Sequence, residues 1–328
     1  MKKFFKVLGY TVLTIILLVS LLLIYVKTAL PNVGDAPKLS VAATPEKIAR
    51  GKYLSNYVTV CVDCHSTRDW TKFAAPIIDG TLGKGGERFD QQMGFPGVYY
   101  SKNITPAGVS RYTDGELFRL ITTGVTKEGR AMFPVMPYRH YGEMDSTDIE
   151  AIIAYIRSLP SIENPVPESA SDFPMNFIIN TIPKKANPQK LPAKTDLLAY
   201  GKYLVNASSC IDCHTRVEKG QIIQELGFSG GREFLMPGGM LRSANITPDA
   251  ATGIGSWTQE VFVRKFKSFA DSTYQSPLVK PGEFNSIMPW KMYSGMTEED
   301  LGAIYQYLKT IPAISNKVEK FTVQVAAK

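Results

Sequence analysis

The chain has 328 residues, a length that suggests about two domains with additional segments. Hydrophobic residues make up 44% and charged residues 20% of the chain, which is an ordinary composition for a folded protein. The formal net charge of +7 is spread along the sequence without a run of five or more basic residues. These features argue against a nucleic-acid partner and fit contact with acidic protein surfaces or anionic lipid.

The first predicted element is a membrane-spanning helix at the N-terminus. Lys2, Lys3 and Lys6 precede twenty uncharged, mostly apolar residues at 7–26, enough to cross a bilayer. A signal peptide begins in the same way, but its apolar core has about 7–15 residues and its cleavage site follows closely. The best small-residue cluster lies further on, at 41–43. We therefore expect an uncleaved anchor over 1–27, with the lysines cytoplasmic and the remaining chain on the periplasmic side of a bacterial inner membrane.

A tether and a helix are predicted next. Residues 28–43 contain two prolines and a glycine without any periodic pattern, which indicates an extended tether. Thr44 is a typical N-cap and Pro45 a typical first helical residue, so a helix should begin there and run toward Cys61.

Two short motifs carry the chemistry of the sequence. Cys61-Val62-Asp63-Cys64-His65 recurs as Cys210-Ile211-Asp212-Cys213-His214, and all four cysteines of the chain lie in these motifs. The pattern Cys-x-x-Cys-His is typical of c-type haem attachment, in which two thiols bind the haem vinyl groups and the histidine binds the iron. The sequence therefore predicts two covalently bound haem c groups, held by Cys61, Cys64, His65, Cys210, Cys213 and His214.

Other interpretations of the motifs explain less of the pattern. Two local disulfides would leave the histidine after each cysteine pair unexplained. A zinc ribbon has its cysteine pairs about 15–20 residues apart, whereas these pairs are 149 residues apart. A thioredoxin-like redox pair requires a surrounding βαβ pattern, and none is evident.

An internal repeat indicates the architecture. The offset between matching residues is constant at 152 from Met136 to Pro160. We therefore predict an all-α fold of two tandem haem domains, at 44–160 and 195–328, after one N-terminal transmembrane helix. The matching segments are Gly51-Lys52-Tyr53-Leu54 with Gly201-Lys202-Tyr203-Leu204, Asn103-Ile104-Thr105-Pro106 with Asn245-Ile246-Thr247-Pro248, Met136-Pro137 with Met288-Pro289, and Asp148 with Asp300.

The segment at 161–194 is predicted to be an inter-domain linker. Its six prolines exclude a helix and favour extended chain. Helices that close each repeat have clear starts, with Asp145 as the N-cap of the first and Thr297 as the N-cap of the second.

The second axial ligand of each iron decides the function. Met136 and Met288 occupy equivalent positions, each followed by proline in a loop, and we predict that they are the iron ligands opposite His65 and His214. His140 is an alternative ligand in the first repeat, where the second repeat has Met292. Two filled axial positions leave no vacancy for a substrate, so the predicted function is electron transfer without bond chemistry.

The residues of the second repeat resemble a known family. The runs at 245–249 and 252–257, with that at 133–138 in the first repeat, are similar to the multi-haem cytochrome c subunits of membrane-bound alcohol and gluconate dehydrogenases. The resemblance implies a class I cytochrome c fold for each domain, and Met136 and Met288 match the axial methionines of that family. Those subunits usually carry three haem motifs, whereas this chain has two.

The leading functional hypothesis is a membrane-anchored dihaem electron carrier that is not an enzyme. Its partners would be a dehydrogenase or quinol-oxidising complex on one side and a terminal oxidase or soluble cytochrome on the other. The alternative is a dihaem peroxidase with one open or displaceable haem site, although the shortage of histidines leaves few proton donors. A haem-based sensor would need an output domain, and a structural subunit of a respiratory complex is compatible with electron transfer.

Overall fold

The structure is a computed structural model that describes residues 1–236, 238–271 and 273–323. Up to the end of the first repeat its elements are α1 (Lys2–Thr28), α2 (Pro45–Tyr53), the π-helix η1 (Leu54–Val58), α3 (Cys61–Cys64), β1 (Arg88–Phe89), the 3-10 helix η2 (Gln91–Met93), β2 (Gly97–Tyr100), α4 (Pro106–Val109), α5 (Asp114–Thr123), α6 (Tyr138–Tyr141) and α7 (Ser146–Ser158). The connecting segment contains β3 (Ala170–Ser171), α8 (Met175–Ile178) and the 3-10 helix η3 (Ile179–Thr181). The remaining elements are α9 (Leu197–Ala207), α10 (Cys210–Cys213), β4 (Val217–Glu218), β5 (Gln221–Ile222), the 3-10 helix η4 (Gln224–Leu226), β6 (Glu233–Met236), β7 (Gly239–Arg242), α11 (Gln259–Lys267), α12 (Trp290–Tyr293), α13 (Glu298–Leu308) and β8 (Phe321–Val323).

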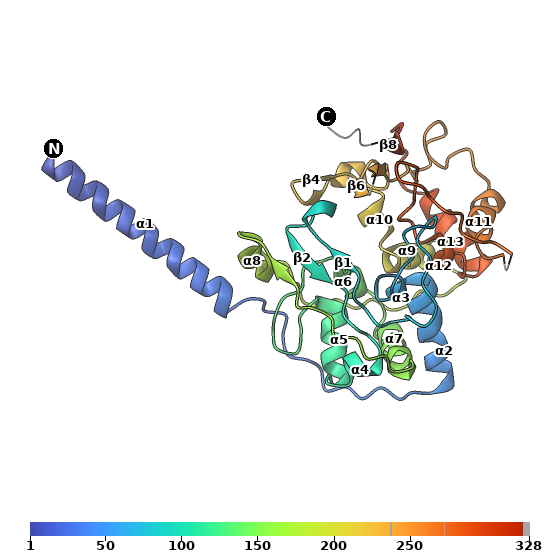
Figure 1. Ribbon diagram of the computed structural model, residues 1–328, viewed down its shortest axis with the longest axis horizontal. Helices are drawn as coiled ribbons and strands as arrows, with labels where there is room; N and C mark the ends of the chain where they lie inside the picture. The colour runs from blue at the N-terminus through green and yellow to red at the C-terminus, as the bar shows by residue number, and fades with distance from the viewer. Residues whose placement is uncertain (237, 272, 324–328) are drawn as a thin grey trace.

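Helix α1 extends away from the rest of the molecule (Figure 1). It has 27 residues, its most apolar 18-residue stretch has a mean hydropathy of 2.7, and none of its residues is buried. At about 1.5 Å per residue it is longer than the roughly 30 Å of a bilayer hydrocarbon core. Among the described residues this is the one helix whose length and composition suit a membrane span, and a signal sequence would share these properties.

A crossed pair of helices forms the centre of each repeat. In the first repeat α2 packs against α7, and a Cβ atom added to Gly51 would lie 1.8 Å from the backbone oxygen of Ala151. In the second repeat α9 packs against α13, and a Cβ added to Gly201 would lie 2.0 Å from the oxygen of Ala303. Glycine therefore lets the two helices approach closely at the same place in both repeats.

The predicted helix starts are confirmed. The Thr44 hydroxyl accepts a hydrogen bond from the backbone N–H of Lys47 at the start of α2. Asp145 caps α7 by accepting from Thr147, and Thr297 caps α13 by accepting from Asp300. Local capping chemistry thus fixes where both closing helices begin.

The prediction of an all-α fold is wrong, because the described residues also form three small sheets. In the first repeat β1 and β2 form an antiparallel hairpin, and β3 returns to pair with β2. In the second repeat β6 and β7 form the hairpin, and β8 pairs with β7. Strands β4 and β5 form a separate pair. The strands have two to four residues, which is too short for a clear alternating pattern in the sequence.

The proline-rich segment also departs from the prediction that it contains no helix. Its prolines frame one helical turn, α8, which continues into η3. Beyond this turn the chain runs along the first repeat, where Asn187 donates its backbone N–H to Gly142 and Leu191 donates to the Asp145 carboxylate. Short helical turns fit between prolines because proline tolerates the first turn of a helix.

The first repeat has one residue more than the second between its first helix and its Cys-x-x-Cys-His motif. Ten residue steps separate Gly51 from Cys61, whereas nine separate Gly201 from Cys210. The first repeat absorbs the extra residue in the π-helix η1, where the Thr59 N–H donates to the Leu54 oxygen at 2.8 Å. Such single-turn bulges often lie at functional sites, and this one leads directly into the first Cys-x-x-Cys-His motif.

The two repeats are joined by crosswise hydrogen bonds. Tyr53 of the first repeat donates its hydroxyl to Asp300 of the second at 2.6 Å. Tyr203, at the equivalent position of the second repeat, donates to Asp148 of the first at 2.7 Å. Both carboxylates are almost completely buried, with side chains 4% and 1% exposed for Asp148 and Asp300. The repeats therefore face one another in a nearly symmetrical arrangement.

Candidate functional site

The two Cys-x-x-Cys segments form single helical turns, α3 and α10. Each follows a residue in the left-handed region, Val60 with φ 45° and Ser209 with φ 52°, which turns the chain sharply after the preceding helix. Residues three apart lie on one face of a helix, so both thiols of a motif point the same way. The histidine follows as the C-cap residue of each turn.

The four thiols are available for attachment. All four cysteines are free, without any disulfide among them, so the alternative of two local disulfides is not what the structure contains. Burial raises the pKa of the Cys64 and Cys210 thiols to about 12. These thiols are therefore neutral at physiological pH.

Each motif histidine donates one hydrogen bond to a backbone carbonyl. The Nδ1 atom of His65 lies 2.6 Å from the oxygen of Lys102, and Nδ1 of His214 lies 2.8 Å from the oxygen of Ala244. A carbonyl can only accept, so Nδ1 carries the proton and Nε2 is left with its lone pair for a metal. Burial lowers the pKa of both imidazoles, which further favours this neutral form.

A glycine in the left-handed region packs against each of these accepting peptides and also bonds to the backbone of the motif histidine. The N–H of Gly85 donates to the His65 oxygen at 2.8 Å, and the N–H of Gly230 donates to the His214 oxygen at 2.7 Å. A Cβ atom at Gly85 would lie 2.5 Å from the Lys102 carbonyl carbon, and one at Gly230 would lie 2.4 Å from that of Ala244. Both glycines have positive φ, so a larger residue would be strained and would also displace the accepting peptide.

The repeated Asn-Ile-Thr-Pro segments hold the same peptides from the other side. The Asn103 side-chain oxygen accepts from the N–H and hydroxyl of Thr105, and its amide donates to the oxygen of Ile162 at 2.7 Å. Asn245 makes the same bonds to Thr247 and to the oxygen of Ile314 at 2.8 Å. The residue before each asparagine is the one that accepts from the histidine, so these bonds fix its position.

The predicted methionine ligands lie in equivalent loops. Met136 and Met288 are partly buried and pack against the hydrophobic core. Each accepts a backbone hydrogen bond of 2.8 Å from the residue two positions later, Tyr138 or Trp290, just before a one-turn helix. In contrast, Met144 and Met296 are fully buried core residues, 0% and 1% exposed. Met136 and Met288 as iron ligands remain a prediction.

His140, the alternative ligand, has partners elsewhere. Its Nδ1 lies 2.7 Å from the Asn206 side-chain oxygen and its Nε2 lies 3.0 Å from the Asp212 carboxylate, both in the second repeat. Asp212 lies within the second Cys-x-x-Cys-His motif. Both ring nitrogens are thus engaged by acceptors, and His140 links the first repeat to the second haem motif.

The first motif has a different electrostatic neighbour. Arg68 donates to Asp63 of the motif at 2.9 Å and to Glu87 at 2.9 Å, and its side chain is only 7% exposed. The Trp70 indole also donates to Glu87, at 2.8 Å. Burial raises the pKa of Asp63 despite the nearby guanidinium. The sequence did not predict this network, because no pattern near the motif indicates that the chain brings Glu87 back into contact with Arg68.

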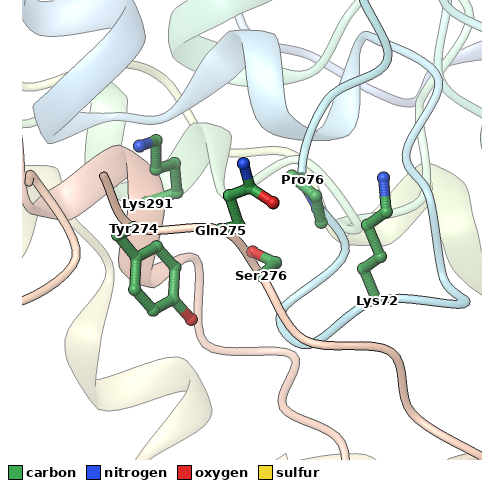
Figure 2. Close-up of a pocket in the computed structure, with 6 residues that line it drawn as sticks. All are labelled: Lys72, Pro76, Tyr274, Gln275, Ser276 and Lys291. Carbon is green, nitrogen blue, oxygen red and sulfur yellow. The ribbon is translucent and has the colours of Figure 1, made fainter. Parts of the chain in front are cut away.

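A surface cavity of about 230 Å³ lies between loops of the two repeats. Figure 2 shows Lys72 and Lys291 at its opposite sides, with Gln275 and Ser276 between them and Tyr274 on the side of Lys291. None of the predicted haem-binding residues lines it, so it is separate from the attachment motifs.

The chemistry of the donor set fits a covalently bound haem. Each repeat supplies two free thiols on one helical turn, an imidazole with an oriented Nε2 and a thioether in an ordered loop. The supporting glycines and carbonyls were missed from the sequence, although the repeated Asn-Ile-Thr-Pro segments marked their position. When bound, haem iron would supply reversible one-electron oxidation, and these residues would hold it.

Comparison with known proteins found relatives over most of the chain. The cytochrome c subunit of a quinone alcohol dehydrogenase from Gluconacetobacter polyoxogenes is 26% identical over 306 residues, which cover 86% of this chain and 60% of the relative. The fructose dehydrogenase cytochrome subunit of Gluconobacter japonicus is 24% identical, covering 95% of this chain and 60% of the relative. A diheme c-type cytochrome of Cereibacter sphaeroides is 25% identical, covering 86% of this chain and 91% of the relative. No family model matches the chain.

The predicted resemblance to dehydrogenase cytochrome c subunits is confirmed. Two of these relatives are named as cytochrome subunits of dehydrogenases, and the prediction of an electron carrier that is not an enzyme agrees with them. The chain spans about 60% of the length of the two dehydrogenase subunits. The chain spans most of the diheme cytochrome. The two haems in the name of that relative equal the number of Cys-x-x-Cys-His motifs in this chain.

Proposed function

We propose that this protein is a membrane-anchored dihaem cytochrome c. It receives electrons from a dehydrogenase or quinol-oxidising complex and delivers them to a terminal oxidase or soluble cytochrome on the periplasmic side of the inner membrane. The observation that carries the proposal is the duplicated histidine arrangement, in which His65 and His214 each donate Nδ1–H to a backbone carbonyl. With Nδ1 protonated in this way, Nε2 of each histidine keeps its lone pair for the proposed iron.

The proposed ligand sets are His65 with Met136 and His214 with Met288. A thioether favours reduced iron and raises the reduction potential, which suits a carrier near the oxidising end of a respiratory chain. The crosswise bonds of Tyr53 and Tyr203 support electron transfer between the two sites, because they hold the repeats against one another. The apolar helix α1 supports membrane attachment through its length and exposure.

Redox titration of single-methionine variants tests the proposal. In Met136→Ala and Met288→Ala, we expect haem attachment to survive, because the thiols and the histidine remain. We expect the potential of only the altered site to fall, and the near-infrared sulfur-to-iron band of that site to disappear. Met132→Ala and Met292→Ala are matched controls, because these methionines lie in the same regions but are not proposed as ligands.

Two results would overturn the assignment. Unchanged potentials in both ligand variants would show that the thioethers do not bind iron. A haem content of one per chain, measured by mass spectrometry of the purified protein, would exclude a dihaem carrier. Membrane attachment is tested separately, since the full chain should remain in the membrane fraction after a high-salt wash.

A further inference from the structure

A small apolar surface lies where the chain leaves β3. It consists of Phe173, Phe177 and Ile178, and we call it the Phe173 patch. Phe173 is 80% exposed and Ile178 is 44% exposed, and the Phe173 and Phe177 rings meet edge to face at 6.4 Å between centroids. An aromatic ring with this exposure contributes little to the core, so the core does not explain it.

The patch lies beside the C-terminal end of the apolar helix. Helix α1 packs against α8 and η3, and Figure 1 shows α8 at the edge of the body nearest this end. The ammonium group of Lys27 lies 5.3 Å from the centre of the Phe177 ring. Lys27 is the first charged residue after the uncharged stretch at 7–26.

This position defines a level relative to a bilayer. If residues 7–26 cross the hydrocarbon core, Lys27 lies at the boundary between lipid and water, where lysine side chains reach the headgroups. Phe177 contacts Lys27 and therefore lies at the same level, with Phe173 and Ile178 beside it. Aromatic side chains are enriched at this boundary.

Basic residues accompany the patch along the same segment. Lys184 and Lys185 are exposed shortly after η3. Arg139 of the first repeat is exposed as well and donates to the backbone oxygen of Ile182 at 3.3 Å. Exposed apolar groups next to exposed cations fit a membrane surface that contains anionic lipid.

We propose that the Phe173 patch inserts into the headgroup region of the membrane that α1 crosses. The inference rests on the proposed anchoring by α1 and adds a second contact between the protein and the lipid. One helix fixes the distance of the haem-bearing body from the membrane, whereas two contacts also fix its orientation. The orientation determines which face of the body is available to a soluble redox partner.

Spin labels on the full-length holoprotein test the patch. With all four native cysteines bound to haem, Phe173→Cys, Leu278→Cys and Leu17→Cys would each introduce the one free thiol. Leu278 is a matched control, because it is apolar and 74% exposed but belongs to the loop that pairs with Lys72. Leu17 lies in the middle of α1 and reports on the anchor itself.

The labelled proteins would be placed in nanodiscs of phosphatidylethanolamine and phosphatidylglycerol. Accessibility of each label to oxygen and to a water-soluble nickel complex then reports on its depth. We expect the oxygen-to-nickel ratio at position 173 to be several-fold higher than at position 278 and lower than at position 17. The ratio at 173 should fall toward that of 278 when Lys184→Glu and Lys185→Glu are added.

Each other outcome overturns a defined statement. A lipid-like ratio at position 17 with a water-like ratio at 173 would reject the patch and leave the anchor intact. A water-like ratio at position 17 would reject both. Shielding of position 173 from both reagents, persisting in detergent without a bilayer, would assign the patch to a protein contact and reject the lipid.

Discussion

The two repeats share the bonds that orient their histidine and differ in the charges beside it. His65 and His214 have the same carbonyl, glycine and asparagine supports. Next to the first motif is a buried ion pair of Asp63 with Arg68, whereas the aspartate of the second motif, Asp212, faces the titratable side chain of His140. The shared bonds serve geometry, which both sites need. If each motif holds a haem as proposed, we expect these different charges to give the two sites unequal reduction potentials and unequal pH dependence.

The largest expected effect tests what the repeats share. In Gly51→Ala and Gly201→Ala the new Cβ would overlap the backbone of α7 or α13. Because backbone cannot move aside cheaply, each variant should lose about 4 kcal/mol of unfolding free energy. Denaturant unfolding of the holoprotein measures the loss, and haem content should fall in the affected repeat.

Gly227→Ala is the control for this pair, since its Cβ would lie 3.3 Å from the Gln224 oxygen and would need only a small adjustment. Equal losses for Gly51→Ala and Gly201→Ala would support equivalent crossings in the two repeats. Wild-type stability in either variant would contradict the close approach of the helices.

The second prediction concerns the charge of the first site. Arg68→Gln leaves the buried carboxylates of Asp63 and Glu87 without their cation, which should cost about 3 kcal/mol of unfolding free energy. The loss should shrink as pH falls, because protonation of Asp63 removes an uncompensated buried charge. The potential of the first haem should fall, and that of the second should stay nearly constant.

Arg88→Gln is a suitable comparison, because Arg88 pairs with Asp90 at 3.1 Å but is 57% exposed. An exposed pair should contribute less than about 1 kcal/mol. Equal effects of the two substitutions on the potentials would mean that the buried network does not set the difference between the sites.

The third prediction concerns the crosswise bonds. Tyr53→Phe should cost about 2 kcal/mol of unfolding free energy and Tyr203→Phe about 1 kcal/mol. The difference arises because Asp148 keeps a bidentate bond to Arg50 at 2.9 and 2.8 Å. Asp300 instead keeps the Tyr200 hydroxyl at 3.0 Å and a more distant Lys194 at 3.6 Å.

Tyr100→Phe serves as the control, since Tyr100 is partly exposed in β2 and is not one of the tyrosines that donate to Asp148 or Asp300. A larger loss in Tyr203→Phe than in Tyr53→Phe would contradict the role of Arg50. Denaturant unfolding curves of both variants at one pH are sufficient to decide which of them loses more unfolding free energy.

Features encoded by short segments could be predicted from the sequence. The caps at Thr44, Asp145 and Thr297 each depend on residues within a few positions of one another, and the two helix crossings lie in short segments that recur in both repeats. The strands could not be predicted, because β3 and β8 return from distant parts of the chain to pair with β2 and β7. Two-residue and three-residue strands also give no reliable period.

The different charged neighbours of the two motifs also could not be predicted from the sequence. His140 meets partners 66 and 72 positions away. The repeat alignment places Met292 opposite His140, which suggested a role within its own haem site. The structure instead places the imidazole in contact with the other repeat, because the two repeats face one another rather than standing apart.

The smallest predicted effect is the pH dependence that His140 gives to the second site. Asn206 donates its amide to the His140 backbone oxygen at 3.1 Å, so its side-chain oxygen must face Nδ1. Asp212 faces Nε2, so an acceptor faces each ring nitrogen and both favour the protonated imidazolium form. Although burial opposes the charge, Asp212, Asn206 and Glu143 raise the pKa of His140 above its ordinary value of about 6.5.

The direction of the pH effect follows from this raised pKa. The stabilisation is fully present below the unfolded pKa and is lost as pH rises through the folded pKa. His140→Gln should therefore be about 1 kcal/mol less stable than wild type near pH 5 and should approach it in alkaline solution. The second haem should lose potential in wild type as pH rises through this range, because a nearby cation that favours reduced iron disappears, whereas the variant should show a flatter profile. A first-haem potential that responds equally would place the titrating group elsewhere, since Arg68 keeps its charge throughout this range.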